Sequence, residues 1–234
     1  MNLPRRLLAE ALGSMLLAAT VIGSGIMAQR LAGGNVAVAL LANTGATVAA
    51  LAVLIAVLGP VSGAHLNPAV SLVAWLRGRL SLREAAIYMT AQVTGCIAGA
   101  LLAHAMFELP LVQASTHVRA GAAQALAEFV ATFGLLLVIL GNPRSKDTPW
   151  LVAAWIGAAY WFTASTSFAN PAITIARSLT NTFSGIRPND VPVFIAAQLA
   201  GALAAMIVAR ALFSAPAPVA VPSADVAPAS DAVR

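Results

Sequence analysis

Long apolar stretches, separated by short polar gaps, dominate the hydrophobic pattern of this chain. Residues 31–76 contain no Asp, Glu, Lys or Arg, yet one helix of that length would be far longer than a bilayer is thick. The Gly-Gly-Asn gap at 33–35 therefore separates two spans. The pattern predicts an all-α membrane protein with six spanning helices, at about 6–29, 37–58, 83–105, 121–141, 150–165 and 191–212, and two half-helices, at about 68–77 and 171–179.

Both half-helices begin at the tripeptide Asn-Pro-Ala, which occurs as Asn67-Pro68-Ala69 and as Asn170-Pro171-Ala172. Proline at the first position of a helix removes no hydrogen bond. A break inside a hydrophobic stretch, however, leaves backbone groups unpaired, which is costly wherever lipid surrounds them. The breaks therefore have to be packed in protein or line water. Two of them, one in each half of the chain, predict two re-entrant segments that meet at a pore.

The two halves of the chain repeat each other. The Ala-Glu pair at 9–10 recurs at 127–128, and the pattern Ala-Gln-x-x-Gly at 91–95 recurs at 197–201. Three spans in each half is an odd number, so the halves have to enter the membrane from opposite sides, as an inverted 3+3 repeat. We expect one channel domain at 1–213, with repeats at about 5–106 and 119–213, and a disordered Ala/Pro-rich tail at 214–234.

Composition supports this class. Of the 234 residues, 60% are hydrophobic and 9% are charged, whereas a soluble domain carries about 25% charge. The net charge of +5 does not indicate a nucleic-acid partner, because the basic residues lie in short gaps between apolar runs. One cysteine, Cys96, excludes an intramolecular disulfide and a thiol metal cluster. We expect no metal site and no cofactor.

The basic residues favour a topology with both termini in the cytoplasm, because more of them then lie inside than outside. The inner set is Arg5, Arg6, Arg77, Arg79, Arg83, Arg144, Lys146 and Arg210, and the outer set is Arg30, Arg119, Arg177 and Arg187. The basic, then apolar, N-terminus has the pattern of a signal peptide, but Glu10 interrupts it and the segment recurs in the second half. We therefore interpret it as a retained first helix.

Five polar side chains are candidates for function. Asn67 and Asn170 can cap the half-helices and still point an amide NH₂ at a passing oxygen, while the facing positive helix ends repel cations and protons. Glu10 and Glu128, inside predicted spans, either couple transport to protons or accept hydrogen bonds from loop backbone. His65 either braces the first loop or acts as a pH gate.

The chain resembles the major intrinsic proteins, the aquaporins and aquaglyceroporins. The resemblance rests on Ser-Gly-Ala-His-Leu-Asn-Pro-Ala-Val at 62–70, Phe-Ala-Asn-Pro-Ala at 168–172, and the repeated Ala-Glu and Ala-Gln-x-x-Gly segments. It implies six tilted helices around one pore in each subunit, and a homotetramer of four pores in lipid. It also favours the bracing role for both glutamates.

The selectivity filter departs from that of a water channel. In aquaporins an Arg directly follows the second Asn-Pro-Ala, with a His or Gly and an aromatic residue nearby. Counted from the two Asn residues, the filter positions here are Thr47, Ala158, Ser167 and Ile173, none of which is aromatic, His or Arg. Three small side chains predict a wider pore, and an Ile in place of Arg adds an apolar wall. Arg177, one turn beyond Ile173, either restores a charge at the pore mouth or belongs to a vestibule or interface.

We therefore predict a passive channel for small uncharged solutes: water, glycerol-like polyols, and the hydroxides of arsenite and antimonite. The metalloid part rests on the segment after the second Asn-Pro-Ala, which resembles a bacterial subgroup associated with such solutes. The alternatives are a strict water channel, or a proton-coupled secondary transporter that uses Glu10 or Glu128. No residue pairing typical of an intramembrane enzyme occurs, so we predict no enzymatic activity. We expect a multi-pass protein of the bacterial inner membrane.

Overall fold

The computed structural model describes residues 1–142 and 145–213, and within these ranges the chain forms helices and loops with no β-strand. The first half forms α1 (Leu3–Leu31), α2 (Val36–Ser62), α3 (Pro68–Leu76) and α4 (Leu82–Met106). The second half forms α5 (Ala122–Gly141), the 3-10 turn η1 (Ser145–Asp147), α6 (Thr148–Phe162), α7 (Pro171–Arg177), the 3-10 turn η2 (Pro188–Asp190) and α8 (Val191–Phe213). The tail expected at 214–234 and the expected inner Arg144 lie outside the described residues.

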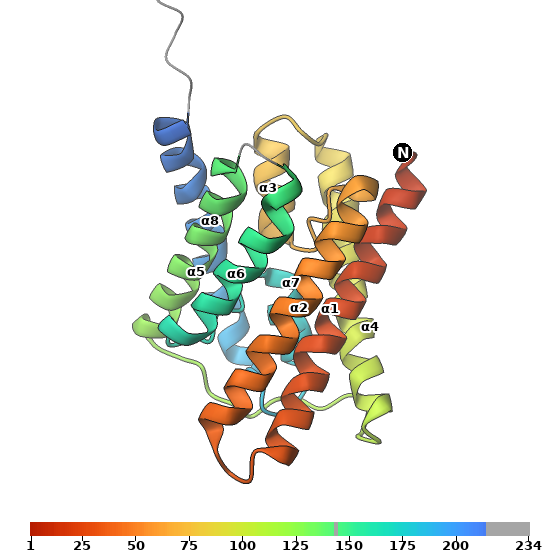
Figure 1. Cartoon of the computed structure of the whole chain (residues 1–234), viewed down its shortest axis with the longest axis vertical. Coiled ribbons are helices and arrows are strands. Elements are labelled where there is room, and N and C mark those ends of the chain that lie inside the picture. The colour runs from red at the N-terminus through yellow and green to blue at the C-terminus, as the bar shows by residue number, and fades with distance from the viewer. Residues whose placement is uncertain (143–144, 214–234) are drawn as a thin grey trace, which may run out of the picture.

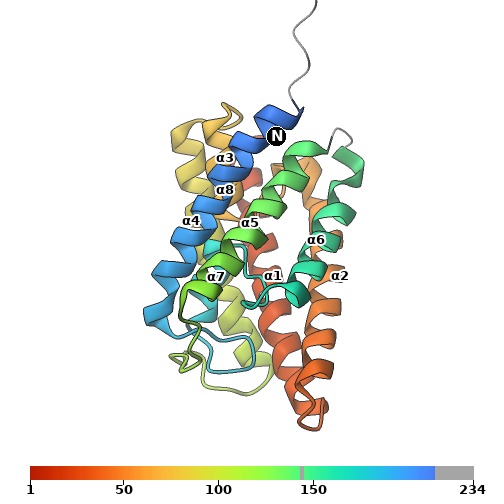
Figure 2. The ribbon, with the colours of Figure 1, turned by 90° about the vertical axis from the view of Figure 1, so that its left-hand side faces the viewer.

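In the described part of the chain, six helices (α1, α2, α4, α5, α6 and α8) surround the two half-helices α3 and α7, which confirms the predicted fold class. Figures 1 and 2 show α3 in the part of the bundle that carries the N-terminus, and α7 nearer the middle, with the loops around 107–121 and 178–190 at the opposite end. The two half-helices contact each other, and each also contacts the last helix of the other half, α4 with α7 and α3 with α8. The halves are therefore interlocked at the centre of the bundle.

Five helices are long and apolar enough to cross a membrane: α1, α2, α4, α5 and the segment Pro188–Phe213 that contains α8. The fifth predicted span corresponds to α6, which has 15 residues and is about 22 Å long, less than the roughly 30 Å hydrocarbon layer. The chain covers the remaining depth with the loop at 163–170, most of which is buried in protein. A non-helical segment is acceptable there because lipid does not reach it.

Helix α2 continues past residue 58, where the second predicted span was expected to end. Pro60 lies inside the helix, which runs on to Ser62. Proline disturbs the turn that precedes it rather than the turn that follows. The helix instead ends at Gly63, whose φ of 92° lies in the left-handed region that favours glycine.

Glycines of the repeated Ala-Gln-x-x-Gly pattern allow the first and last helices of each half to approach closely. A Cβ on Gly95 in α4 would overlap the carbonyl of Ala11 in α1, and a Cβ on Gly201 in α8 would overlap the carbonyl of Phe129 in α5. Small residues at such crossings permit backbone contact between helices in a membrane. The same pattern therefore has the same packing role in both repeats.

Gly201→Ala is expected to destabilise the protein by about 1–3 kcal/mol, because backbone, not a flexible side chain, occupies the space of the new Cβ. The measurement is the thermal midpoint of the purified protein in detergent. Gly45→Ala is the matched control, since Gly45 is an exposed helical glycine in α2 with open space around its Cβ position. Equal midpoints for the two variants would contradict the close crossing of α5 and α8.

Candidate functional site

The two Asn-Pro-Ala segments meet where the half-helices begin. Asn67 caps α3 and Asn170 caps α7, with each side-chain Oδ1 accepting the backbone N–H two residues on, at 2.9 Å and 3.0 Å. Each amide nitrogen reaches across to the other segment: Asn67 Nδ2 donates to the Ala169 carbonyl at 2.7 Å, and Asn170 Nδ2 donates to the Leu66 carbonyl at 2.8 Å. One of the two N–H bonds of each amide is thereby used in holding the tips together.

The remaining residues of the tripeptides make this close meeting sterically feasible. Pro68 and Pro171 occupy the first helical position, and Ala69 and Ala172 are fully buried behind them. Because each amide keeps a second N–H and both Asn side chains line the central cavity, that second N–H is available to a molecule in the pore. The tripeptides therefore place both amide groups at the cavity.

Glu10 braces the first return loop. Its carboxylate accepts hydrogen bonds from the backbone N–H of His65 at 3.0 Å and of Leu66 at 2.7 Å, from the Ser62 hydroxyl at 2.6 Å and from Gln92 Nε2 at 2.8 Å. Glu10 is fully buried. Both carboxylate oxygens therefore accept hydrogen bonds that hold the loop to α1.

Glu128 braces the second return loop in the same way. It accepts hydrogen bonds from the backbone N–H of Phe168 at 2.8 Å and of Ala169 at 2.9 Å, and from Gln198 Nε2 at 2.6 Å. Gln198 also donates to the Thr174 hydroxyl of α7, as Gln92 donates to the Ser71 hydroxyl of α3. In each half, the Gln of the sequence repeat is thus hydrogen-bonded both to the Glu and to a hydroxyl group of the half-helix.

A cavity of about 560 Å³ is lined by Asn67 and Asn170 and by residues from both halves of the chain. It is lined near the N-terminal end by Arg77 and Arg79, and near the opposite end by Arg177. Among the described residues, no acidic side chain lines it. The cavity therefore has basic ends and no carboxylate along the path, an arrangement that disfavours cations.

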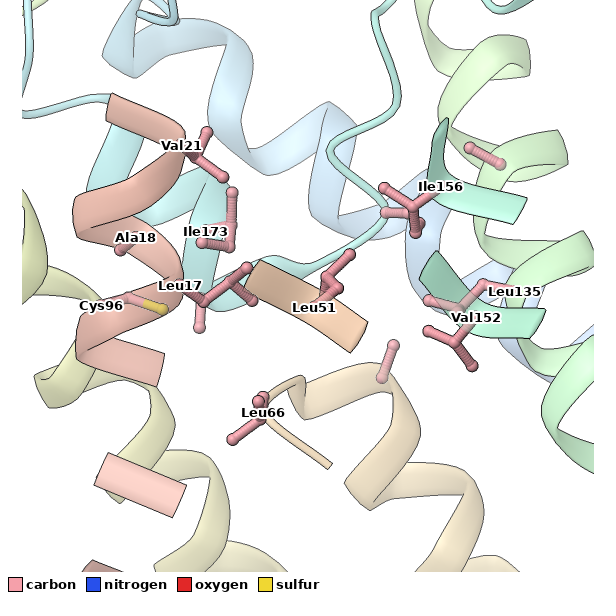
Figure 3. Packing of buried hydrophobic residues seen from close by; sticks show 14 of the residues in the cluster. Leu17, Ala18, Val21, Leu51, Leu66, Cys96, Leu135, Val152, Ile156 and Ile173 are labelled. Carbon is pink, nitrogen blue, oxygen red and sulfur yellow. The ribbon is translucent and has the colours of Figure 1, made fainter. Parts of the chain in front are cut away.

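The walls of this cavity are largely apolar. Val21 and Ile173 lie on one side of the packed region, Ile156 and Val152 lie across from them, and Leu51 lies between (Figure 3). Apolar walls with a few fixed donors suit a solute that is itself small and uncharged, because a charged solute would lose its hydration without replacement.

Three of the four expected filter residues line the cavity, and one does not. Thr47, Ser167 and Ile173 lie on its wall, all 2–4% exposed. Ala158 is exposed on the outer side of α6, while Tyr160 lines the cavity, with its hydroxyl 3.3 Å from Thr47 Oγ1. An aromatic residue, Tyr160, therefore lies on the cavity wall where the small Ala158 was expected.

The helical repeat explains the error at Ala158. Residues 152, 156 and 160 follow one another at a spacing of four and share the cavity face of α6. A residue two positions from Tyr160 is turned by about 200° around the helix axis, so Ala158 faces away. Spacing from the Asn residues does not show which face of α6 a residue occupies. The spacing of four between residues 152, 156 and 160 could have identified Tyr160 as a residue of the cavity face.

His65 lies in the first loop and lines the cavity. Its Nδ1 is 3.1 Å from the Ser71 hydroxyl, its backbone N–H bonds to Glu10, and its ring packs at a tilt against Tyr88 with centroids 5.5 Å apart. Two of these contacts hold the ring and the third holds the backbone, an arrangement that fits the bracing interpretation more directly than a gate.

Arg177 reaches the cavity wall from the end of α7. It is 2% exposed, its Nε donates to the Ser184 carbonyl, and its guanidinium carbon lies 3.3 Å above the centre of the Phe168 ring. A cation above an aromatic face is stabilised by the ring quadrupole. These contacts hold Arg177 at the cavity wall.

A second arginine, which the motifs did not indicate, lies against the same ring. Arg119, in the loop after α4, lies 5.1 Å from the Phe168 centroid and donates to the carbonyls of Gly185 at 2.8 Å and Ser165 at 3.1 Å. Burial lowers the pKa of Arg119, although Glu128 and Tyr160 oppose the shift. In the same loop, burial and the charges of Arg119 and Arg177 lower the pKa of His117.

Comparison with known proteins agrees with this architecture. The sequence profile of the family described as "Major intrinsic protein" matches residues 1–163. The chain is 57% identical to aquaglyceroporin AqpS of Rhizobium meliloti, over 89% of this chain and 90% of that protein. It is 31% identical to aquaporin A of Dictyostelium discoideum, over 69% of this chain and 62% of that protein.

A solved structure has the same fold. The X-ray structure of the aquaglyceroporin from Plasmodium falciparum superimposes with a TM-score of 0.66, covering 88% of this chain and 95% of that one. The sequence identity of that pair is 21%, so the likeness concerns the arrangement of the helices.

Proposed function

Because this chain belongs to the major intrinsic protein family, whose members are channels and not enzymes, we propose that it passes glycerol-like polyols and the trihydroxides of arsenite and antimonite as well as water. The observation that carries the proposal is the largely apolar cavity that runs past both Asn side chains. Its few fixed donors favour a neutral solute with oxygen acceptors. The close relative named an aquaglyceroporin supports the polyol part.

The filter that we propose consists of Thr47, Tyr160, Ser167 and Ile173. Ile173 supplies apolar surface where a charged residue would narrow the path, and Thr47 and Ser167 supply hydroxyl groups. Thr47 Oγ1 donates its proton to the Asn43 carbonyl at 2.8 Å, so it can act towards a solute only as an acceptor. A path with one apolar and one hydroxylated wall suits a polyol, whose carbon and oxygen atoms lie on opposite sides.

The two alternative functions fit less well. A proton-coupled transporter would need Glu10 or Glu128 to exchange protons with the path, yet both carboxylates are buried and occupied by loop donors. A strict water channel would need a narrow charged filter, and Ile173 occupies that position.

We further propose a homotetramer in the bacterial inner membrane with the termini in the cytoplasm. The larger number of basic residues at the N-terminal end supports this orientation of the termini.

Purified protein in liposomes is expected to raise the rates of glycerol and arsenite entry well above those of empty liposomes, together with the rate of water exchange. Shrink–swell light scattering measures water and glycerol, and trapped arsenic measures arsenite. Rapid water flux with glycerol and arsenite at the empty-liposome level would indicate a strict water channel. Solute flux that follows an imposed proton gradient would indicate coupled transport.

A further inference from the structure

The two return loops differ in the donor that holds the carbonyl near their beginning. Ser62 and Ser165 each lie five residues before the Asn of their Asn-Pro-Ala segment, so they are equivalent positions of the repeat. The Ser62 carbonyl accepts the hydroxyl proton of Tyr88 in α4 at 3.0 Å. The Ser165 carbonyl instead accepts from Nη1 of Arg119 at 3.1 Å, and Arg119 lies in the loop between α4 and α5.

A missing hydroxyl group explains this difference. Tyr88 and Phe194 each lie four residues before the Gln of the repeated Ala-Gln-x-x-Gly pattern, so Phe194 is the equivalent of Tyr88 without its oxygen. Both rings are fully buried, and each packs against the ring two positions before the Asn of its loop, His65 at 5.5 Å and Phe168 at 5.1 Å. The second half therefore keeps the ring contact, and Arg119 supplies the donor.

The segment beside this donor has an unfavourable backbone conformation. Thr166 and Ser167 have φ angles of 60° and 48°, in the left-handed region that residues with a side chain rarely adopt. Ser167 is also part of the cavity wall. Arg119 contacts the chain on both sides of these two residues, at the Ser165 carbonyl and at the Phe168 ring. These contacts oppose a relaxation of the segment that would move the wall.

Arg119 is held in place by groups outside the return loop. Its Nε donates to the Gly185 carbonyl at 2.8 Å, and its backbone N–H donates to Asp190 Oδ2 at 2.8 Å. Backbone hydrogen bonds also join residues 113–117 to residues 178–187. The position of the guanidinium is therefore set by the two loops that it joins, and the return loop packs against it.

We propose that Arg119 is a positioning residue of the pore, which replaces the hydroxyl that Phe194 lacks and thereby fixes the wall at Ser167. It acts through the return loop and not on the solute, because the described residues that line the cavity do not include it. This inference rests on the proposed function and adds to it the residue that sets the width of the path at the second return loop.

The test compares the ratio of glycerol to water flux in proteoliposomes of Arg119→Ala and of the double variant Arg119→Ala/Phe194→Tyr. Arg119→Ala is expected to lower the ratio about tenfold, the order expected for a lost hydrogen bond to a charged group, because a polyol is larger than water and depends more on the wall. In the double variant, the new hydroxyl is expected to donate to the Ser165 carbonyl, as Tyr88 donates to Ser62, and to restore most of the ratio. An effect of charge would not be restored, since a tyrosine is neutral at pH 7.

Arg30→Ala is the matched control. Arg30 also donates to a carbonyl and lies over an aromatic ring, but both belong to Phe107, which follows α4, and not to a return loop. The flux ratio of this variant is expected to equal that of the wild type.

The outcomes separate this inference from the function on which it rests. Glycerol flux of the wild type at the empty-liposome level would refute the proposed function itself. Wild-type glycerol flux with an unchanged ratio in Arg119→Ala would overturn only the positioning role, as would a double variant that stays at the Arg119→Ala ratio. Thermal midpoints are measured alongside. If Arg119→Ala does not fold, the ratio in Arg119→Lys decides, because lysine keeps the charge but lacks the fork that bonds two carbonyls.

Discussion

Glu128→Gln is expected to lower the stability of the protein by about 3 kcal/mol or more, and to remove solute flux with it. The neutral amide can accept at one oxygen, but its NH₂ group then faces donors: the N–H groups of Phe168 and Ala169 and the amide of Gln198. Burial prevents water from replacing the lost acceptor. The second return loop, and with it the position of Asn170, loses its support.

The measurements are the thermal midpoint in detergent and glycerol flux in liposomes. Glu108→Gln is the matched control, since Glu108 is exposed in the loop after α4, and its midpoint is expected to stay at the wild-type value. A Glu128→Gln protein that keeps its midpoint but loses a proton dependence of flux would favour coupled transport over the bracing role.

Ile173→Arg is expected to lower glycerol and arsenite flux by about tenfold or more, while water flux falls less. The new side chain would project into the apolar part of the cavity, near Val21 (Figure 3), and would narrow the path for any solute larger than water. It would also place a second guanidinium one turn from Arg177, which adds to the positive potential there.

Two substitutions serve as controls for this variant. Ile173→Val keeps the apolar wall and is expected to retain wild-type glycerol flux. Ala158→Val tests the corrected filter, because Ala158 faces away from the cavity and its substitution is expected to have no effect on selectivity. If Ile173→Arg left the ratio of solute to water flux unchanged, Ile173 would not belong to the filter.

The fold could be predicted from the sequence because the features that specify it are local and repeated. An Asn-Pro-Ala break in an uncharged stretch has few physical solutions in a membrane, and its duplication with the Glu and Gln patterns requires an inverted repeat. The bracing role of Glu10 and Glu128 follows from the same logic. In the structure both carboxylates accept loop N–H groups.

Other features could not be predicted, because they depend on packing between distant segments. The group formed by Arg119, Phe168 and Arg177 joins two loops and the end of α7, and no periodicity in the sequence connects its members. Helix α2 continues past Pro60 and ends at the left-handed Gly63, so the proline did not mark the helix end. The short α6 reflects a return loop that is buried deeply enough to need no helix.

The reciprocal bonds from Asn67 to Ala169 and from Asn170 to Leu66 bear on how the molecule is assembled. During synthesis the first Asn enters the membrane about a hundred residues before its acceptor exists, so the first loop stays unfinished until the second half arrives. Each half therefore needs the carbonyl acceptor of the other half to complete its loop. A chain that inserts one repeat wrongly would leave both Asn amides without their carbonyl acceptors.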